Sequence, residues 1–293
     1  MNDFIDQVVA GLAAGGIYAS LALALVIIYT AVGLVNFAQG EFAMFATFIC
    51  YALLTNFNVP YFIAFPIAVA VAFVGAFGIE RAVIRPFYKS SQLSIVLVTL
   101  ALLSITNSTA GFIWGYVPRA FPSPFPFKPV SLLGISVSIQ DSAVIGVTLV
   151  VLVLIWLLIN RTGVGLAMRA AAAYPDTAEL MGIKVGNMRG LGWGLAAAAG
   201  AVSGILVAPR IFLEPNMMQG IIVYAFAAAV LGGIDNPVGA VVGGLLLGVM
   251  LALVGAYIPA LADLRLEMTL GLIILLLVVR PSGLFGRRHV KRV

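Results

Sequence analysis

The feature that most constrains this chain is a series of long apolar runs separated by short polar stretches. A helix of about 20 apolar residues spans the hydrocarbon core of a bilayer, whereas a membrane β-barrel shows shorter segments of alternating hydrophobicity. Hydrophobic residues make up 62% and charged residues 9% of the chain, against roughly half and a quarter in soluble domains. The sequence therefore predicts an all-α, polytopic membrane protein. The predicted segments are Val8–Leu34, Phe42–Leu54, Tyr61–Ile79, Leu93–Trp114, Ser142–Ile159, Gly190–Val207, Met218–Leu231, Val238–Tyr257 and Met268–Val279.

The basic residues indicate which connections face the cytoplasm. They gather in residues 81–89, in the loop 161–189 and in the tail 281–293, and the positive-inside rule places such connections in the cytoplasm. By alternation, the Pro- and Phe-rich loop 115–141 lies outside, where residues 134–140 alternate like an extended strand. The net charge of +5 is therefore explained by topology and by contact with the lipid bilayer, and not by nucleic acid.

The number of crossings depends on how one short segment is interpreted. The run 42–54 follows NFAQGE, Asn36–Glu41, a polar cluster between apolar runs. The acidic N-terminus favours an outer location and nine transmembrane helices. If NFAQGE instead opens a re-entrant half-helix, the N-terminus lies inside and eight remain. Short or broken segments are tolerated only where they are buried in protein or line a cavity, so both alternatives place Asn36–Glu41 near the functional interior.

A five-residue pattern, Asn-x-x-Gln-Gly, occurs at Asn36–Gly40 and again at Asn216–Gly220. With nine crossings, the two copies lie on opposite sides of the membrane. That arrangement is what an inverted repeat predicts, with interrupted segments that meet at a transport site. The alternative is a chance recurrence of a loose pattern.

The loop 161–189 contains a short predicted helix with its own start and stop signals. Pro175 suits the first helical position, and Asp176 suits the positive N-terminal end. Gly182 is placed to end the helix in a left-handed cap. A short, capped, partly apolar helix in such a loop is expected to pack on another protein; the alternative is an ordinary amphipathic surface helix. The residues assigned to this contact are Arg169, Ala172, Pro175, Asp176, Ala178, Glu179, Leu180, Gly182 and Ile183.

Five stretches along the chain carry a resemblance to a known family. They are GLVNFAQGEFAMF, ERAVIRP, GLAMRAAAAYPDTAELMGI, AVLGGIDNPVGAVVGG and RPSGLFG. Together they resemble the permease subunits of branched-chain amino acid ABC importers, and most closely the smaller of the two paired permeases. The resemblance covers essentially the whole chain and implies a single permease domain, residues 1–293, in the bacterial inner membrane. Members of that family often have histidine where Gln39 stands here, so this position departs from the family pattern.

The resemblance also implies partners and a substrate class. The partners are a second permease subunit in a heterodimer or a homodimer, two cytosolic ATPase subunits that use ATP with Mg²⁺, and a periplasmic substrate-binding protein. The short helix of loop 161–189 corresponds to the family's coupling helix, which docks in a groove of the ATPase. Branched-chain or other apolar amino acids are the implied substrates. Members of the wider permease family also carry urea, short amides or sugars.

The residues assigned to a substrate pathway combine amides, a hydroxyl, glycines and one acid. Glycine lets the backbone approach a substrate, and amides can pair with the ends of a zwitterion. A charged side chain deep in a membrane costs at least about 2.5 kcal/mol, which points to a function for Glu41. The alternatives are that Glu41 only reaches the interface or complements a helix N-terminus, and that the other polar residues and the glycines bond or pack neighbouring helices. The assigned residues are Asn36, Gln39, Gly40, Glu41, Thr99, Asn107 and Gly220.

The sequence argues against chemistry by this chain itself. None of its lysines follows the Gly-rich cradle of a P-loop, so ATP hydrolysis is expected in a partner and the chain is not expected to be an enzyme or to bind a cofactor. Cys50 is the only cysteine, which leaves no intrachain disulfide and no Cys-based metal site. An ion-coupled transporter or channel usually buries several ionisable residues, and here Glu41 is the one candidate. A passive scaffold would not need the amide and hydroxyl clusters.

Overall fold

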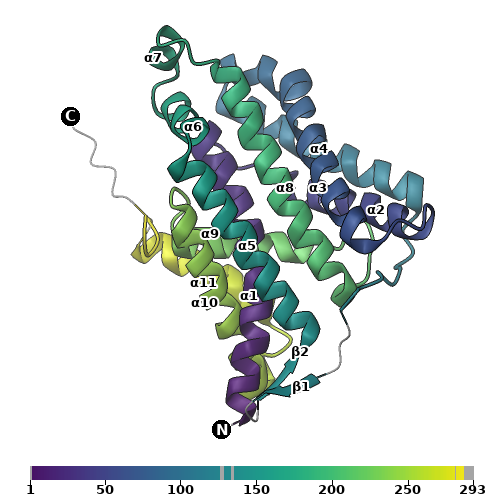
Figure 1. The fold of residues 1–293 in the computed structure, drawn as a ribbon. Helices are drawn as coiled ribbons and strands as arrows, with labels where there is room; N and C mark the ends of the chain where they lie inside the picture. The colour runs from purple at the N-terminus through teal and green to yellow at the C-terminus, as the bar shows by residue number, and fades with distance from the viewer. Residues whose placement is uncertain (1, 126–128, 133–134, 281, 287–293) are drawn as a thin grey trace. The chain divides into compact units, whose positions relative to one another are not determined.

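The computed structural model describes residues 2–125, 129–132, 135–280 and 282–286. Most of the predicted basic tail, 281–293, lies outside these residues. The described chain is largely helical (Figure 1). Its α-helices are α1 (Asn2–Val32), α2 (Gln39–Thr55), α3 (Tyr61–Ile79), α4 (Gln92–Trp114), α5 (Ile139–Arg161), α6 (Gly163–Ala173), α7 (Pro175–Leu180), α8 (Val185–Ile211), α9 (Gln219–Gly232), α10 (Pro237–Tyr257) and α11 (Arg265–Val279).

The prediction of a polytopic, all-α membrane protein is confirmed. Each predicted apolar run is a helix, and six helices in the described part of the chain are long and apolar enough to cross a membrane. The other three predicted crossings are α2, α9 and α11, which have 17, 14 and 15 residues. At about 1.5 Å per residue, helices of this length fall short of a full hydrocarbon core. They are the short segments that the sequence predicted, and the count of eight or nine crossings stays a prediction.

The connections contain the few non-α elements. A π-helical turn (Glu80–Ile84) and a 3₁₀ turn (Arg85–Lys89) follow α3, and a second 3₁₀ turn (Pro259–Leu261) follows α10. Two short strands, β1 (Pro129–Leu132) and β2 (Ile135–Ser138), form an antiparallel hairpin in the predicted external loop. The alternating pattern of residues 134–140 therefore did indicate a strand.

The chain divides into two compact units, each built from segments that are far apart in the sequence. Unit 1 comprises Met1–Val26, Phe125–Leu149 and Gly220–Val293, and unit 2 comprises Ile27–Pro124 and Val150–Gln219. In unit 2, α2 and α3 both pack along α8. In unit 1, the N-terminal part of α1 packs against α10.

Small residues allow the close helix contacts within both units. In unit 2, a Cβ atom added at Gly204 of α8 would lie 2.8 Å from the carbonyl oxygen of Ala43 in α2. In unit 1, a Cβ atom at Gly15 of α1 would lie 2.8 Å from the carbonyl oxygen of Gly244, and one at Gly248 would collide with the Gly15 backbone. Such close approaches at glycines are typical of helix packing in membranes.

Candidate functional site

The break between α1 and α2 is an ordered turn held by hydrogen bonds. Gly33 takes a left-handed φ of +79° just after α1, a conformation that favours glycine. The side-chain oxygen of Asn36 then accepts a hydrogen bond from the Ala38 N–H at 3.0 Å, and the Asn36 amide donates to the Gln39 side chain at 3.4 Å. Asn36 and Gln39 are 1% and 0% exposed. The NFAQGE stretch is therefore an ordered, buried turn that starts α2 at Gln39.

Gln39 fixes this turn to the middle of a long helix. Its side-chain amide donates to the carbonyl oxygen of Ala196 at 2.8 Å. Ala196 lies eleven residues after the start of α8 and fifteen before its end. The broken segment consequently lies at mid-helix depth in unit 2 and not at a helix end, as the rule that irregular backbone must be covered by protein requires.

Glu41 lies at the junction of three segments of unit 2. The carboxylate is 3% exposed and accepts a hydrogen bond from the Asn107 amide of α4 at 3.2 Å. The same amide nitrogen lies 3.0 Å from the Pro215 carbonyl oxygen and 3.2 Å from the Asn216 side-chain oxygen. One amide group carries two hydrogens for these three acceptors, so Asn107 links α2, α4 and the segment before α9.

The second copy of the sequence pattern repeats the local structure of the first. Asn216 accepts from the Gln219 backbone N–H at 3.1 Å and from the Gln219 side chain at 3.0 Å. Gln219 begins α9 as Gln39 begins α2. The two interrupted segments therefore meet, through Asn107. The placement of the two copies on opposite sides of the membrane stays a prediction, because the contact through Asn107 shows only that the two interrupted segments meet.

The other predicted pathway residues lie apart from this junction. Thr99 is 1% exposed, but its hydroxyl donates to the Val96 carbonyl of its own helix at 2.8 Å. It therefore does not form the interhelical bond that was expected, whereas Asn107 does. Gly40 is buried at the start of α2. Gly220 is exposed, faces open space and belongs to unit 1. Asn216 was noticed only as part of the repeated pattern, and that pattern was the signal for its role.

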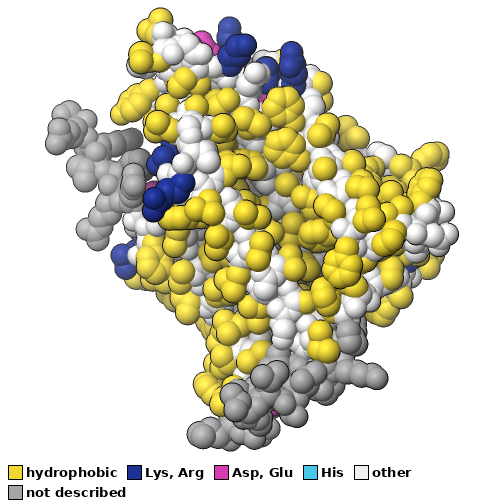
Figure 2. Space-filling view, viewed as in Figure 1, with side chains coloured by type: hydrophobic (Ala, Val, Ile, Leu, Met, Phe, Trp, Pro, Cys, Tyr) yellow, Lys and Arg dark blue, Asp and Glu magenta, His cyan; other side chains and the backbone are white. Residues whose placement is uncertain are grey.

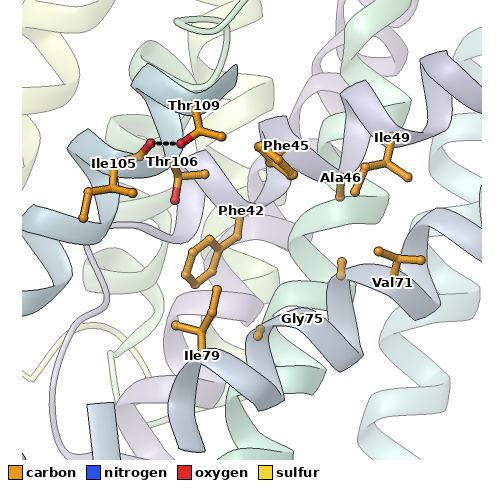
Figure 3. Close-up of a pocket in the computed structure, with 12 residues that line it drawn as sticks. Phe42, Phe45, Ala46, Ile49, Val71, Gly75, Ile79, Ile105, Thr106 and Thr109 are labelled. Atoms are coloured by element: carbon orange, nitrogen blue, oxygen red, sulfur yellow. Dashed lines mark hydrogen bonds between the residues drawn. The ribbon is translucent and has the colours of Figure 1, made fainter. Parts of the chain in front are cut away.

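An apolar pocket of about 240 Å³ adjoins the junction, between α2, α3 and α4. Figure 3 shows the Phe42 ring between Ile79 of α3 and Ile105 of α4, with the Thr106 side chain on the side of α4 that faces this ring. The neighbours of Glu41 and Asn107 in sequence, Phe42 and Thr106, thus line a cavity while the polar residues pair. The remaining lining residues are Phe45, Ala46, Ile49, Val71, Ala72, Gly75, Ala76 and Thr109.

The predicted short helix in loop 161–189 is present as α7, and its end has the expected geometry. Gly182 has a φ of +83°. The Gly182 N–H donates to the Glu179 carbonyl at 2.9 Å, and the Ile183 N–H donates to the Ala178 carbonyl at 2.9 Å. This pair of bonds is a Schellman motif, which satisfies the last carbonyls of the helix. The prediction of a left-handed glycine cap is confirmed.

The two faces of α7 differ in exposure. Ala178 is 4% exposed and packs with Ala171 and Val185 in a small core, so it supports the helix from beneath and cannot itself meet a partner. Leu180 and Met181 are 88% and 79% exposed. Figure 2 shows basic side chains gathered around the α7 end of unit 2. Of the other assigned residues, Arg169, Asp176, Glu179 and Gly182 are exposed, and Ala172, Pro175 and Ile183 are half-buried.

Residues of the basic connection 81–89 contact the C-terminal end of the loop 161–189. Arg85 donates to the Gly186 carbonyl at 2.7 Å and forms an ion pair with Glu80 at 2.8 Å. The Arg189 guanidinium lies over the Tyr88 ring, 4.5 Å from its centroid. The connections 81–89 and 161–189 thus lie side by side, as two loops on one side of a membrane must. Sequence analysis treated Arg85 only as a topology marker, and nothing in the pattern indicated its contact with Gly186.

Within the described residues, no group of three or more His, Cys, Asp or Glu side chains is arranged to hold a metal ion. The site consists of a buried amide turn at mid-helix depth, a second, exposed turn that Asn107 joins to it, and an exposed, capped helix, α7. These features define a helical membrane permease with two exposed apolar side chains, Leu180 and Met181, at the end of α7.

Comparison with known proteins identifies the family. Residues 7–279 match the family described as the branched-chain amino acid transport system permease component. The chain belongs to this family of transport permeases.

Individual relatives agree over nearly the full length. The chain is 32% identical over 308 residues to the high-affinity branched-chain amino acid transport permease BraD of Pseudomonas aeruginosa, covering 99% of this chain and 98% of that one. It is 29% identical over 305 residues to LivH of Escherichia coli K12, with the same coverage. It is also 32% identical over 121 residues, 40% of the chain, to the nucleoside ABC transporter permease NupC of Lactococcus lactis. A structure of PsaBC from Streptococcus pneumoniae shares the fold, with a TM-score of 0.52 at 12% identity over 96% of both chains.

Proposed function

We propose that this chain is the membrane permease subunit of an ATP-binding-cassette importer that carries branched-chain or other apolar amino acids across a bacterial inner membrane. The full-length similarity to branched-chain amino acid permeases supports the substrate class. The exposed Leu180 and Met181 of α7, on the side marked by basic connections, are the observation that supports a separate motor. The whole chain, 1–293, acts as one permease domain in this proposal.

The partners follow from the proposed class. A second permease subunit, identical or different, completes the membrane part, and a periplasmic binding protein delivers the amino acid. Two cytosolic ATPase subunits hydrolyse ATP with Mg²⁺, because this chain lacks a P-loop. The α7 helix is the coupling helix: its buried Ala178 and its Schellman cap hold it rigidly while Leu180 and Met181 enter a groove of the ATPase. A rigid helix transmits the movement of the ATPase to the permease, whereas a mobile loop would absorb that movement.

The substrate pathway passes the junction of Asn36, Gln39, Glu41 and Asn107. Its buried amides and its carboxylate can bind the two ends of a zwitterion, and the adjoining apolar pocket is lined by side chains that suit an aliphatic group. Short helices that begin at this depth can tilt with little loss of membrane burial. Gln39 and Gln219 start such helices in both halves of the chain.

The coupling role is tested with Leu180→Asp in the complete reconstituted importer. The variant should fold normally because the side chain is 88% exposed, but stimulation of ATP hydrolysis by the loaded binding protein should be lost together with uptake. Val164→Asp is the matched control, since Val164 is 48% exposed and lies outside α7. It also does not line the apolar groove on this chain between α6 and α7, of which Met181 is a lining residue. Normal coupled uptake in Leu180→Asp would exclude this surface as the motor contact.

The substrate class is tested by radiolabelled leucine uptake in proteoliposomes with and without ATP at the motor side. Competition by unlabelled leucine, but not by urea, a short amide, a pentose or a nucleoside, is expected. Competition by one of the other solutes would favour the alternative, an ABC permease for that solute. Accumulation by the permease subunits alone, driven by an ion gradient, would instead identify a secondary transporter.

A further inference from the structure

Unit 1 contains a second cavity, separate from the junction described above. It has a volume of about 400 Å³, within the range of roughly 300–1,000 Å³ typical of small-molecule pockets. Four helices of unit 1 contribute to it: α1, α9, α10 and α11 (Figure 1). Its lining residues are Gln7, Ala10, Ala14, Tyr18, Tyr224, Gly248, Leu251, Ala252, Gly255, Ala256 and Arg265.

The lining combines one cation with three neutral polar side chains and a set of small apolar ones. Arg265 is the charged member of the described lining, which includes no carboxylate. Tyr18 and Tyr224 stand together with ring centroids 5.0 Å apart, and Gln7 adds an amide. The remaining wall is alanine, glycine and one leucine. A ligand that suits this lining has an anionic group at one end and a short aliphatic body.

The position of the Arg265 side chain depends on a glycine. A Cβ atom at Gly255 would collide with the Arg265 guanidinium, so the missing side chain lets the guanidinium lie across the end of α10. Asp263 and Glu267 flank Arg265 in the sequence, but both are exposed and neither lines the cavity. The guanidinium is therefore directed toward the cavity by steric room, and it is the one charged group among the described lining residues.

The cavity lies toward the outer side of the membrane under the predicted topology. Arg265 begins α11, and Arg280 with the basic tail follows its other end. The positive-inside rule places that tail in the cytoplasm. Asn236, just before α10, donates to the Phe285 carbonyl oxygen beside the tail, and α10 is long enough to cross a membrane. The Gly255 end of α10, with the Arg265 guanidinium beside it, therefore faces the opposite side. This is the side on which a binding protein would deliver substrate.

We infer that this cavity is an outer binding site for the carboxylate of a small aliphatic α-amino acid, which names a site for the substrate class proposed above and rests on that proposal. Arg265 binds the carboxylate, because a guanidinium presents paired donors that match its two oxygens. The tyrosine ring faces and the Gln7 carbonyl oxygen suit the ammonium group. Leu251 and the alanines of α1 and α10 contact the aliphatic side chain.

The test uses the complete importer in nanodiscs of zwitterionic lipid, without the binding protein. Binding of leucine and of leucinamide, which lacks the carboxylate, is measured on the wild type, Arg265→Gln and Gly255→Ala. The wild type should prefer leucine. Arg265→Gln should bind leucine about tenfold or more weakly, the usual effect of losing a hydrogen bond to a charged group, and should no longer discriminate against leucinamide. Gly255→Ala should weaken leucine binding by displacing the guanidinium.

Arg280→Gln is the matched control, since it removes the same charge from the other end of α11 and should leave leucine binding and discrimination unchanged. Unchanged discrimination in Arg265→Gln would overturn the inference. A lipid phosphate is the other source of an anionic group: if phosphatidylglycerol is retained by the wild type and lost in Arg265→Gln while leucine binding stays normal, the site is a lipid site and the inference is wrong. Failure of the proposed function is distinguishable, because the wild type would then not transport leucine at all.

Discussion

The guanidinium of Arg85 lies 2.8 Å from the carboxylate of Glu80, whose side chain is fully buried. Arg85 also donates to the Gly186 carbonyl oxygen at 2.7 Å, so one residue ties the end of α3 to the start of α8. Gly186 lies six residues after the end of α7 at Leu180, so this tie adjoins the segment that carries α7. The rigidity that the proposed coupling requires therefore depends on a contact between the two basic connections, 81–89 and 161–189.

Replacement of Arg85 should weaken this tie. Arg85→Gln leaves the Glu80 carboxylate buried without its cation, and we expect a loss of about 1–3 kcal/mol in stability, below the roughly 3–5 kcal/mol of a fully buried pair because Arg85 is 29% exposed. Thermal unfolding in detergent measures it. The double variant Glu80→Gln with Arg85→Gln should recover part of the loss. Arg81→Gln, an exposed arginine of the same connection, serves as the control and should unfold like the wild type.

Loss of the Asn107 amide should destabilise the protein more than loss of an average helix side chain. Asn107→Ala leaves the Glu41 carboxylate without its donor, at 3% exposure, and such an orphaned acceptor costs about 1–3 kcal/mol. Glu41→Gln, combined with Asn107→Ala in a double-mutant cycle, should show coupling between the two sites. Ser108→Ala, the exposed neighbour on α4, is the control. Additive effects in the cycle would mean that the Glu41–Asn107 bond is not maintained in solution.

Much of this structure could be predicted from the sequence because the bilayer imposes simple rules. Apolar runs long enough to span a membrane had to be helices, and Pro175 and Gly182 mark the first residue of α7 and its cap through backbone conformations that few other residues adopt. The inner surface of α7 was less predictable. Ala178 and Leu180 are both apolar, and only the packing on Ala171 and Val185 decides which of them is covered.

The polar junction shows where sequence reasoning stopped. The stretch Asn36–Glu41 was recognisable as a polar break between apolar runs, and its Asn36–Gln39 bond spans only three residues. The bond from Asn107 to Glu41 spans 66 residues, and that from Gln39 to Ala196 spans 157. No periodicity encodes such pairs. Nor does any local pattern show that the two Asn-x-x-Gln-Gly copies meet through Asn107.

The cap of α7 should respond to a single methyl group. Gly182 has a φ of +83°, and a side chain in the left-handed region costs roughly 1–2 kcal/mol. Gly182→Ala should therefore loosen α7, and Gly182→Pro should do so more strongly because proline also removes the N–H that donates to Glu179. Proteolytic cleavage between α6 and α8 measures the loosening. Gly163→Ala is the control, since Gly163 has open space and no left-handed φ; equal cleavage in both variants would contradict the expectation.

Gly204 and Gly78 should respond differently to substitution, because only Gly204 lies at the contact of α2 with α8. A Cβ atom at Gly204 would lie 2.8 Å from the Ala43 carbonyl oxygen, whereas one at Gly78 of α3 meets nothing within 4 Å. Gly204→Ala must push α2 away from α8 and should destabilise the protein by about 1–3 kcal/mol, the usual cost of overpacking. Gly78→Ala should be neutral or stabilising by up to about 1 kcal/mol, because alanine is the better helix former. Melting of the two variants under one condition gives the comparison. Because Gln39 binds α8 two turns from Gly204, the Gly204 variant should also lower leucine uptake at temperatures where it stays folded, and unaltered uptake there would separate helix packing from the pathway.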